Sequence, residues 1–303
     1  PREPGVALIH SDLSNFRVKD KDFIWNILYV VEVLVTEGWT LLFPSFTFSF
    51  CSGKPFSHNK SPSETGILAD KVLLNFSGAK RTAAPIYSFV SLGKETASIN
   101  SLLPKTTFGF DSVFEWLEKQ NAQVVMLGCD WKYCTQFHRY EELAAVKYRE
   151  LKTFKGTADY GEGAIFTGST MFVRSIDLEP VNDFSPAVSE MEASDLIKKA
   201  TIFDANIQSS SVNKIKDVCL RQLENDPFSY LSNKNEVLKR VREFTERNKQ
   251  DELSISVFSS KNTELFERHL KLFLDDLVPE RKSLIRQIPF GQMYKSLIDQ
   301  AGN

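Results

Sequence analysis

Val6-Ala-Leu-Ile9 and Thr40-Leu-Leu-Phe43 are the two stretches that decide the fold class of this chain. Each is a short apolar run of the kind found in buried strands, and the residues from Ile24 to Thr36 between them are apolar at helical spacing. A strand, a helix and a second strand in such close succession indicate a βαβ unit. The sequence therefore predicts an α/β fold with a mixed central sheet flanked by helices.

Polar residues follow both of these strands. His10, Ser11 and Asp12 come directly after the first strand, and Ser45 and Thr47 follow the second. Ligands of α/β proteins bind at the carboxyl ends of the strands. We therefore expect these side chains to surround a binding site.

A third apolar run, residues 122–128, is the clearest buried strand, and it leads into a helical segment that contains His138. Glu141 lies three residues further on, on the same helix face. An imidazole oriented by a carboxylate can remove a proton from an amine or a hydroxyl near neutral pH. Glu142 would point about 100° away, so we prefer Glu141 as the partner. Taken alone, such a pair is also typical of exposed helix surfaces.

The remaining sequence divides into two parts. Residues 1–249 form the predicted catalytic domain, and residues 250–303 form either its C-terminal lobe or the start of a second domain. Further helices are expected at 66–74, 111–119, 191–200, 213–223 and 236–248, and strands between 165 and 180. A new strand-helix pattern begins near 252, after a charged break, and no motif of the catalytic domain falls there. We therefore expect a chain that ends near Lys249 to keep its activity.

Composition excludes several classes of protein. Lys and Arg number 37 against 39 Asp and Glu, and a net charge of −2 argues against a nucleic-acid binder. The four cysteines lack metal-ligand spacing, so we predict no metal site and reduced thiols, as in cytoplasmic proteins. The longest apolar run, near residues 24–35, is too short and too polar to span a membrane. The chain begins at Pro1 without the apolar stretch of a signal peptide. We expect it to be a piece of a longer protein.

Several short motifs occur in a recognisable order. They are His10-Ser11-Asp12-Leu13, Gly38-Trp-Thr-Leu-Leu-Phe-Pro44-Ser-Phe-Thr47, Ser61-Pro-Ser-Glu-Thr65-Gly66, Arg81-Thr82-x-x-Pro85-x-x-Ser88, Thr135-x-x-His138-x-x-Glu141 and Tyr148-Arg149. Over roughly residues 6–240, this series resembles the aminoglycoside 3-N-acetyltransferase family, also called the antibiotic N-acetyltransferase family. The resemblance implies an antibiotic N-acetyltransferase-like fold, acetyl-CoA as co-substrate, and direct acyl transfer to an amine. It implies His138 as general base and Glu141 as the group that orients it.

The same resemblance, together with simple chemistry, indicates where coenzyme A would bind. A helix start at residues 63–66 offers free backbone amides to a phosphate, and Arg81 could add a bidentate clamp. Thr47 is a candidate donor to the oxyanion of the transition state. The residues expected around coenzyme A are His10, Ser11, Asp12, Thr47, Ser63, Thr65, Gly66, Arg81 and Thr82.

Two departures from the family pattern bear on the acceptor. Asp12 and Ala84 stand where aminoglycoside-modifying members commonly have Ser and His. The form seen here looks more like the family branch found with polysaccharide and sugar biosynthesis, so we expect a small-molecule acceptor, an amino sugar. Alternatives are transfer to a hydroxyl, an acyl carrier protein as donor, aminoglycoside N3-acetylation, or a non-catalytic CoA-binding module. Residues after 252 resemble faintly the HAD-like enzymes that load glyceryl units onto carrier proteins. The sequence leaves the oligomeric state open.

Overall fold

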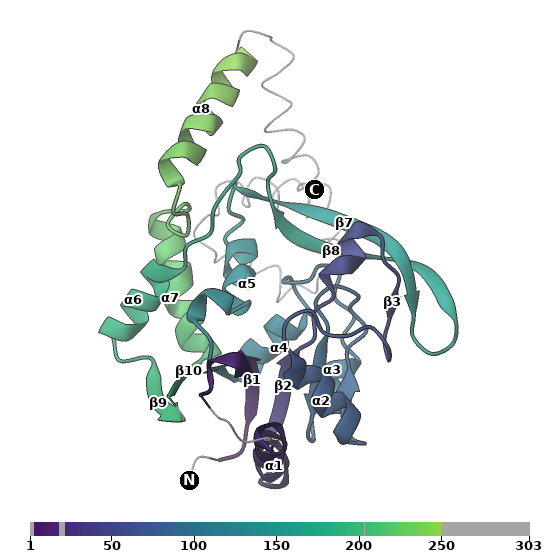
Figure 1. Cartoon of the computed structure of the whole chain (residues 1–303). Helices are drawn as coiled ribbons and strands as arrows, with labels where there is room; N and C mark the ends of the chain where they lie inside the picture. The colour runs from purple at the N-terminus through teal and green to yellow at the C-terminus, as the bar shows by residue number, and fades with distance from the viewer. Residues whose placement is uncertain (1–2, 18–21, 203, 250–303) are drawn as a thin grey trace, which may run out of the picture.

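A computed structural model describes residues 3–17, 22–202 and 204–249 (Figure 1). Its strands are β1 (Val6–Ser11), β2 (Thr40–Pro44), β3 (Phe56–Ser57), β4 (Lys80–Arg81), β5 (Phe89–Leu92), β6 (Gln123–Leu127), β7 (Arg149–Asp159), β8 (Ala164–Arg174), β9 (Lys198–Ile202) and β10 (Ala205–Ser211). Its α-helices are α1 (Phe23–Thr36), α2 (Ile67–Asn75), α3 (Thr96–Asn100), α4 (Val113–Lys119), α5 (Gln136–Leu143), α6 (Ser185–Ala193), α7 (Val212–Asn225) and α8 (Lys234–Lys249). Short 3-10 helices occupy Leu13–Asn15, Phe48–Ser52 and Trp131–Tyr133.

The central sheet has seven strands in the order β4-β5-β2-β1-β6-β10-β9. Strand β1 pairs in parallel with both β2 and β6, whereas the outer strands pair antiparallel. The prediction of an α/β fold with a mixed central sheet is confirmed. Because β1, β2 and β6 run in the same direction, the loops after Ser11, Pro44 and Leu127 leave the sheet at the same edge.

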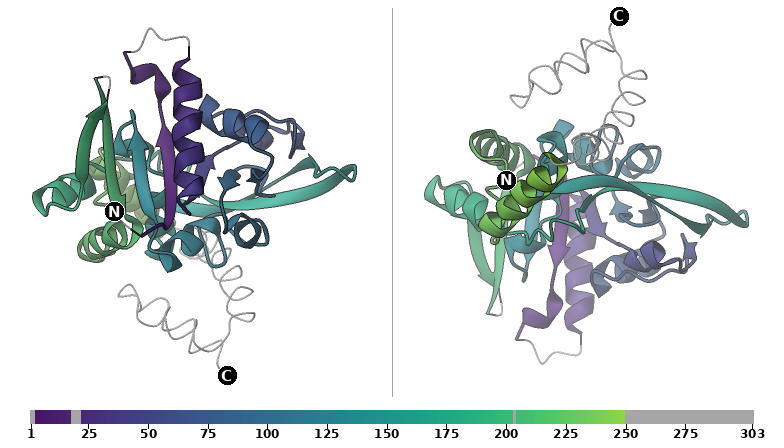
Figure 2. Two further views of the ribbon diagram at one scale, coloured as in Figure 1. Left: turned by 90° about the horizontal axis from the view of Figure 1, so that it is seen from below. Right: turned by 90° about the horizontal axis from the view of Figure 1, so that it is seen from above.

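Alternating residues of the central strands build two separate cores. Val6 and Leu8 of β1 point into the larger core with α4, α5 and α7, and Ala7 and Ile9 point into the smaller one with α1 and α2. This period of two, with apolar residues at both phases, is what a strand buried on both faces requires. Figure 2 shows α1 running alongside β1, and the helices α6 and α7 next to β9 and β10 at the other end of the sheet.

A second sheet of three strands lies beside the central one. Strands β7 and β8 form an antiparallel hairpin with register from Arg149↔Arg174 to Asp159↔Ala164, and β3 adds to β7 in parallel. Figure 1 shows this hairpin extending away from the body of the molecule. Its first residue, Arg149, follows α5 closely along the chain, so the base of the hairpin adjoins the helix that carries His138.

Most expected elements are present within two or three residues of their predicted bounds, but two expectations were wrong. The helix expected at 191–200 is instead the end of α6 followed by strand β9, whose five residues are all exposed. Pairing with β10 holds this edge strand, so tertiary contacts override local propensity. The strands expected between 165 and 180 are a single strand, β8, which ends at Arg174. The strand that pairs with it, β7, was not predicted from the sequence.

The proposed second part of the chain, residues 250–303, lies outside the described residues, so the domain division stays a prediction. Within the described ranges, no helix is both long enough and apolar enough to cross a membrane.

Candidate active site

The helix that carries His138 starts just beyond the carboxyl end of β6. Gly128 follows this strand with φ +70°, and a Cβ added there would lie 2.6 Å from the backbone oxygen of Asp12. Asn15 donates from Nδ2 to the carbonyl oxygen of Gly128 at 2.8 Å. The loops after β1 and β6 are therefore held against each other, which places the start of α5 beside the end of β1.

His138 and Glu141 form the pair that their spacing predicts. His138 Nδ1 lies 2.5 Å from Oε2 of Glu141. The Glu141 side chain is 0% exposed, while that of His138 keeps 22% of its surface accessible. Nε2 of His138 makes no hydrogen bond within the described part of the chain. Glu142 turns to Thr106 instead, which donates to its Oε1 at 2.6 Å.

Three further residues converge on the Glu141 carboxylate. Tyr148 and Asn182 donate to Oε1 at 2.9 and 2.7 Å. Arg149 places its Nε 3.0 Å from Oε2, as an ion pair whose N–H direction is not aligned for a hydrogen bond. Burial by itself would raise the pKa of Glu141, but Arg149 and His138 outweigh it and lower the pKa to about 2. Glu141 is thus ionised at all physiological pH values.

The charge on Glu141 assigns the proton of His138. An ionised carboxylate can only accept, so Nδ1 of His138 carries the hydrogen and Nε2 carries the lone pair. Arg149 also approaches Nδ1 with one of its terminal nitrogens, at 3.2 Å. Burial, followed by the Arg149 charge, lowers the pKa of His138 below 6.5 despite the opposing effect of Glu141. The imidazole is therefore neutral at neutral pH, in the form that can accept a proton.

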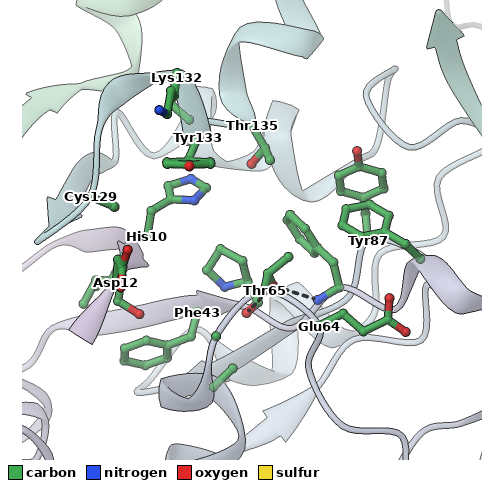
Figure 3. A pocket seen from close by; sticks show the side chains of 18 of the residues that line it. His10, Asp12, Phe43, Glu64, Thr65, Tyr87, Cys129, Lys132, Tyr133 and Thr135 are labelled. Carbon is green, nitrogen blue, oxygen red and sulfur yellow. Dashed lines mark hydrogen bonds between the residues drawn. The ribbon is translucent and has the colours of Figure 1, made fainter. Parts of the chain in front are cut away.

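A cavity of about 490 Å³ opens at the carboxyl edge of the central sheet, and His138 forms part of its wall. Figure 3 shows His10 and Cys129 at one end and Tyr87 and Glu64 at the other. The site residues predicted from the sequence that line it are His10, Ser11, Asp12, Thr65, Gly66 and His138. Six residues from three separate stretches of sequence thus meet in one cavity.

His10 is the most unusual of these. It is buried, its Nε2 has no hydrogen-bond partner among the described residues, and burial lowers its pKa to about 4. A neutral imidazole with an unpaired nitrogen on a cavity wall is available to a polar group of a ligand. Asp12 is already engaged, since Oδ1 accepts from the backbone and hydroxyl of Ser14.

Arg81 points inward rather than into the cavity. Its guanidinium donates to the carbonyl oxygens of Ser61 and Ser45 at 2.5 and 2.6 Å and to the hydroxyls of Thr47 and Ser88 at 2.7 and 2.8 Å. The side chain is 2% exposed, and burial lowers its pKa to about 10. These bonds tie together the segments after β2 and before α2, which form the floor of the cavity.

Three other predicted residues are also absent from the cavity wall. Thr47 accepts the Arg81 bond, and the backbone amide of Ser63 is bound by both carboxylate oxygens of Asp70. Thr82 lines a separate cavity of about 350 Å³ and accepts from the amide of Phe89. The structure therefore separates the nine residues expected around coenzyme A into five that line the cavity and four that do not.

Four residues of the site were not predicted from the sequence. Tyr148 and Arg149 belong to one of the motifs without an expected role, and Asn182 and Tyr87 gave no signal at all. Asn182 belongs to the segment between β8 and α6, and Tyr87 belongs to the loop before β5. Their distance along the chain from His138 explains the omission. Among the described residues, no cluster of three or more His, Cys, Asp or Glu could hold a metal ion.

Comparisons with known proteins identify the family of this chain. The sequence profile of the aminoglycoside 3-N-acetyltransferase family matches residues 8–224. No curated protein sequence matches the chain.

Solved structures of this family share the fold. AAC-IIIb in a binary complex with CoASH is 19% identical, with a TM-score of 0.62 over 73% of this chain and 90% of that chain. A mutant of aminoglycoside acetyltransferase AAC(3)-IVa in complex with apramycin is 23% identical, with a TM-score of 0.60 over 74% and 87%. The YokD protein from Bacillus subtilis is 19% identical, with a TM-score of 0.62 over 75% and 89%. The chain belongs to the aminoglycoside 3-N-acetyltransferase family of acetyl-CoA-dependent N-acetyltransferases.

Proposed function

We propose that His138 is the general base of an acetyl transfer from acetyl-CoA to an amine of a small amino sugar. The observation that carries this proposal is the buried His138–Glu141 pair on the wall of the cavity. The pair holds Nδ1 and leaves Nε2 as the group that meets the acceptor. A non-catalytic CoA-binding module would not require this arrangement.

The chemistry follows from the protonation states. An amine is mostly protonated at neutral pH, and only its neutral form, which has already released one proton to solvent, attacks a thioester. As the new C–N bond forms, Nε2 of neutral His138 takes a proton from the attacking nitrogen. The ionised carboxylate of Glu141 stabilises the imidazolium that results. The imidazolium then returns the proton to the departing thiolate of coenzyme A.

Coenzyme A would occupy the cavity between the ends of β1 and the start of α2. His10, Ser11, Thr65 and Gly66 line this space, and the unpaired Nε2 of His10 suits a polar group of the pantetheine arm. The AAC-IIIb complex with CoASH supports the same co-substrate. Arg81 would make none of these contacts, because its guanidinium is hydrogen-bonded to the protein.

The charges that line the cavity bear on the acceptor. Asp12 and Glu64 are the carboxylates among the lining residues, and each already accepts hydrogen bonds from its own neighbourhood. Lys132 lines the same cavity. An amino sugar with a single amine fits this balance better than a polycation. Aminoglycosides remain the second candidate, because the related AAC(3)-IVa structure contains apramycin.

The test is an assay of thiol release from acetyl-CoA, with product mass determined for a panel of acceptors. The panel contains nucleotide-linked amino sugars, the corresponding alcohols, and aminoglycosides. His138→Ala should lower kcat by roughly 10²–10⁴-fold, while calorimetry shows that coenzyme A still binds. His58→Ala, outside the cavity, is the control. Near-normal kcat in His138→Ala would overturn the assignment, and a higher kcat/KM for aminoglycosides would replace the acceptor.

A further inference from the structure

Tyr87 lies on the wall of the same cavity as His138, at the end away from His10 (Figure 3). Its ring is held by other aromatic rings, with centroids 4.5 Å from Phe46 and 5.1 Å from Phe108. The residue is 9% exposed. The side chain is therefore fixed in place, and only a small part of it reaches the cavity.

The hydroxyl of Tyr87 differs from those of the other buried tyrosines. Tyr140 donates to the carbonyl of Val212, Tyr148 to Glu141, and Tyr230 to the carbonyl of Cys219. Tyr87 has no hydrogen-bond partner anywhere in the described ranges, yet its oxygen is not sealed off from solvent. The hydroxyl of a largely buried tyrosine normally has a partner. Tyr87 lines both the cavity that it shares with His138 and the separate cavity of about 350 Å³, and a ligand in the shared cavity would supply that partner.

The position of Tyr87 relative to His138 is set by Phe108. The ring of Phe108 contacts both residues, with centroids 5.1 Å from Tyr87 and 5.6 Å from His138. Burial raises the pKa of Tyr87 to about 12, and the charges of Arg149 and Glu141 also act on it. The hydroxyl thus stays protonated at neutral pH and lies within electrostatic reach of the His138 cluster.

We propose that the Tyr87 hydroxyl donates a hydrogen bond to the thioester carbonyl oxygen of acetyl-CoA and to the oxyanion that develops on it. This inference rests on the proposed function. As the amine nitrogen bonds to the carbonyl carbon, the π electrons move to the oxygen beside Tyr87. When the C–S bond breaks, the carbonyl re-forms and the sulfur leaves as thiolate. Tyr87 keeps its proton throughout, because His138 moves the only proton that is transferred.

This role replaces the one that the sequence suggested for Thr47. Thr47 does not line the cavity, and its hydroxyl is bound by Arg81. A donor whose hydrogen bond strengthens as the carbonyl oxygen becomes an oxyanion affects kcat far more than substrate binding. Loss of one such donor costs roughly 10²–10³-fold in kcat.

The decisive variant is Tyr87→Phe, which keeps the packed ring and removes only the hydroxyl. We expect kcat to fall roughly 10²–10³-fold with little change in KM for acetyl-CoA or for the amine. Tyr29→Phe, on the exposed side of α1, is the matched control. Wild-type kcat in Tyr87→Phe would overturn the proposal. A raised KM for the amine with unchanged kcat would also overturn it, because Tyr87 would then bind the acceptor.

A spectroscopic measurement separates this inference from the proposed function. The ketone analogue of acetyl-CoA, with CH₂ in place of sulfur and a ¹³C-labelled carbonyl, is bound to the full chain and observed by infrared difference spectroscopy. The carbonyl band should lie at lower wavenumber in the wild type than in Tyr87→Phe. An identical band in both overturns the role of Tyr87 whether or not an acceptor has been found. If the wild type does not bind the analogue, both proposals fail.

Discussion

Arg149 places its Nε 3.0 Å from the buried Oε2 of Glu141 and a terminal nitrogen 3.2 Å from Nδ1 of His138. One cation thus contacts both members of the pair. It favours the ionised form of Glu141 and opposes the protonated form of His138. Both effects keep the imidazole neutral and ready to accept a proton, so Arg149 positions and tunes the base without facing the cavity itself.

Substitution of Arg149 by glutamine should move the acid limb of the pH profile of kcat/KM to higher pH. In the wild type, burial first and Arg149 second lower the pKa of His138, so the limb lies below pH 6.5. The profile is measured between about pH 4 and 8. Arg174→Gln is the control, and it should produce a smaller shift in the same direction because Arg174 acts more weakly on the pKa of His138. An acid limb unchanged in Arg149→Gln would contradict this account.

Glu141→Gln should lower kcat less than His138→Ala but reduce stability more. The amide can still orient the ring through Nδ1, so the base remains in place. Its neutral side chain leaves the buried Arg149 unpaired, a change that typically costs roughly 3–5 kcal/mol. Thermal unfolding and kcat of both variants, measured at the same pH, show which variant loses more stability and which loses more activity. A Glu141→Gln protein with wild-type stability would mean that the ion pair contributes nothing.

Arg81→Gln should lower the unfolding free energy by at least about 2 kcal/mol, since charged hydrogen bonds of this kind contribute strongly when buried. The three bonds to residues after β2 and before α2 and the bond to Ser88 would be lost together. Lys80→Ala, at an exposed neighbouring position, is the control and should leave stability unchanged. Calorimetry with coenzyme A on the same proteins tests whether Arg81 binds a phosphate of coenzyme A. Normal stability of Arg81→Gln combined with weaker binding of coenzyme A would support that contact.

Glu142→Gln should flatten the pH dependence of stability between about pH 5 and 8. Burial raises the pKa of Glu142 from 4.5 to about 7, against the opposing effect of its bond from Thr106. Stability from this carboxyl is therefore fully present below pH 4.5 and is lost as the pH rises through 7. The wild type should lose about 3 kcal/mol more than the variant over this range. Urea denaturation at both ends of the range measures the difference, and parallel curves would refute it.

Several features of this protein were determined by local sequence alone. The apolar runs at residues 6–9, 40–43 and 122–128 are strands of the central sheet, and the run between the first two is α1. His138 and Glu141 pair as predicted because residues three apart share one helix face. Such features depend on periodicity within a single element, which a sequence displays directly.

Only the tertiary structure decided what surrounds that pair and which way the other candidates face. Arg149 and Asn182 reach Glu141 from β7 and from the segment after β8, through strand register and loop packing. Arg81 was expected at a phosphate and instead binds the protein interior, because most of the carbonyls and hydroxyls that it needs come from two segments distant in sequence. The position of the Tyr87 hydroxyl is likewise set by packing against rings remote in sequence. Contacts between remote residues depend on how whole elements pack, and no spacing along the chain records that.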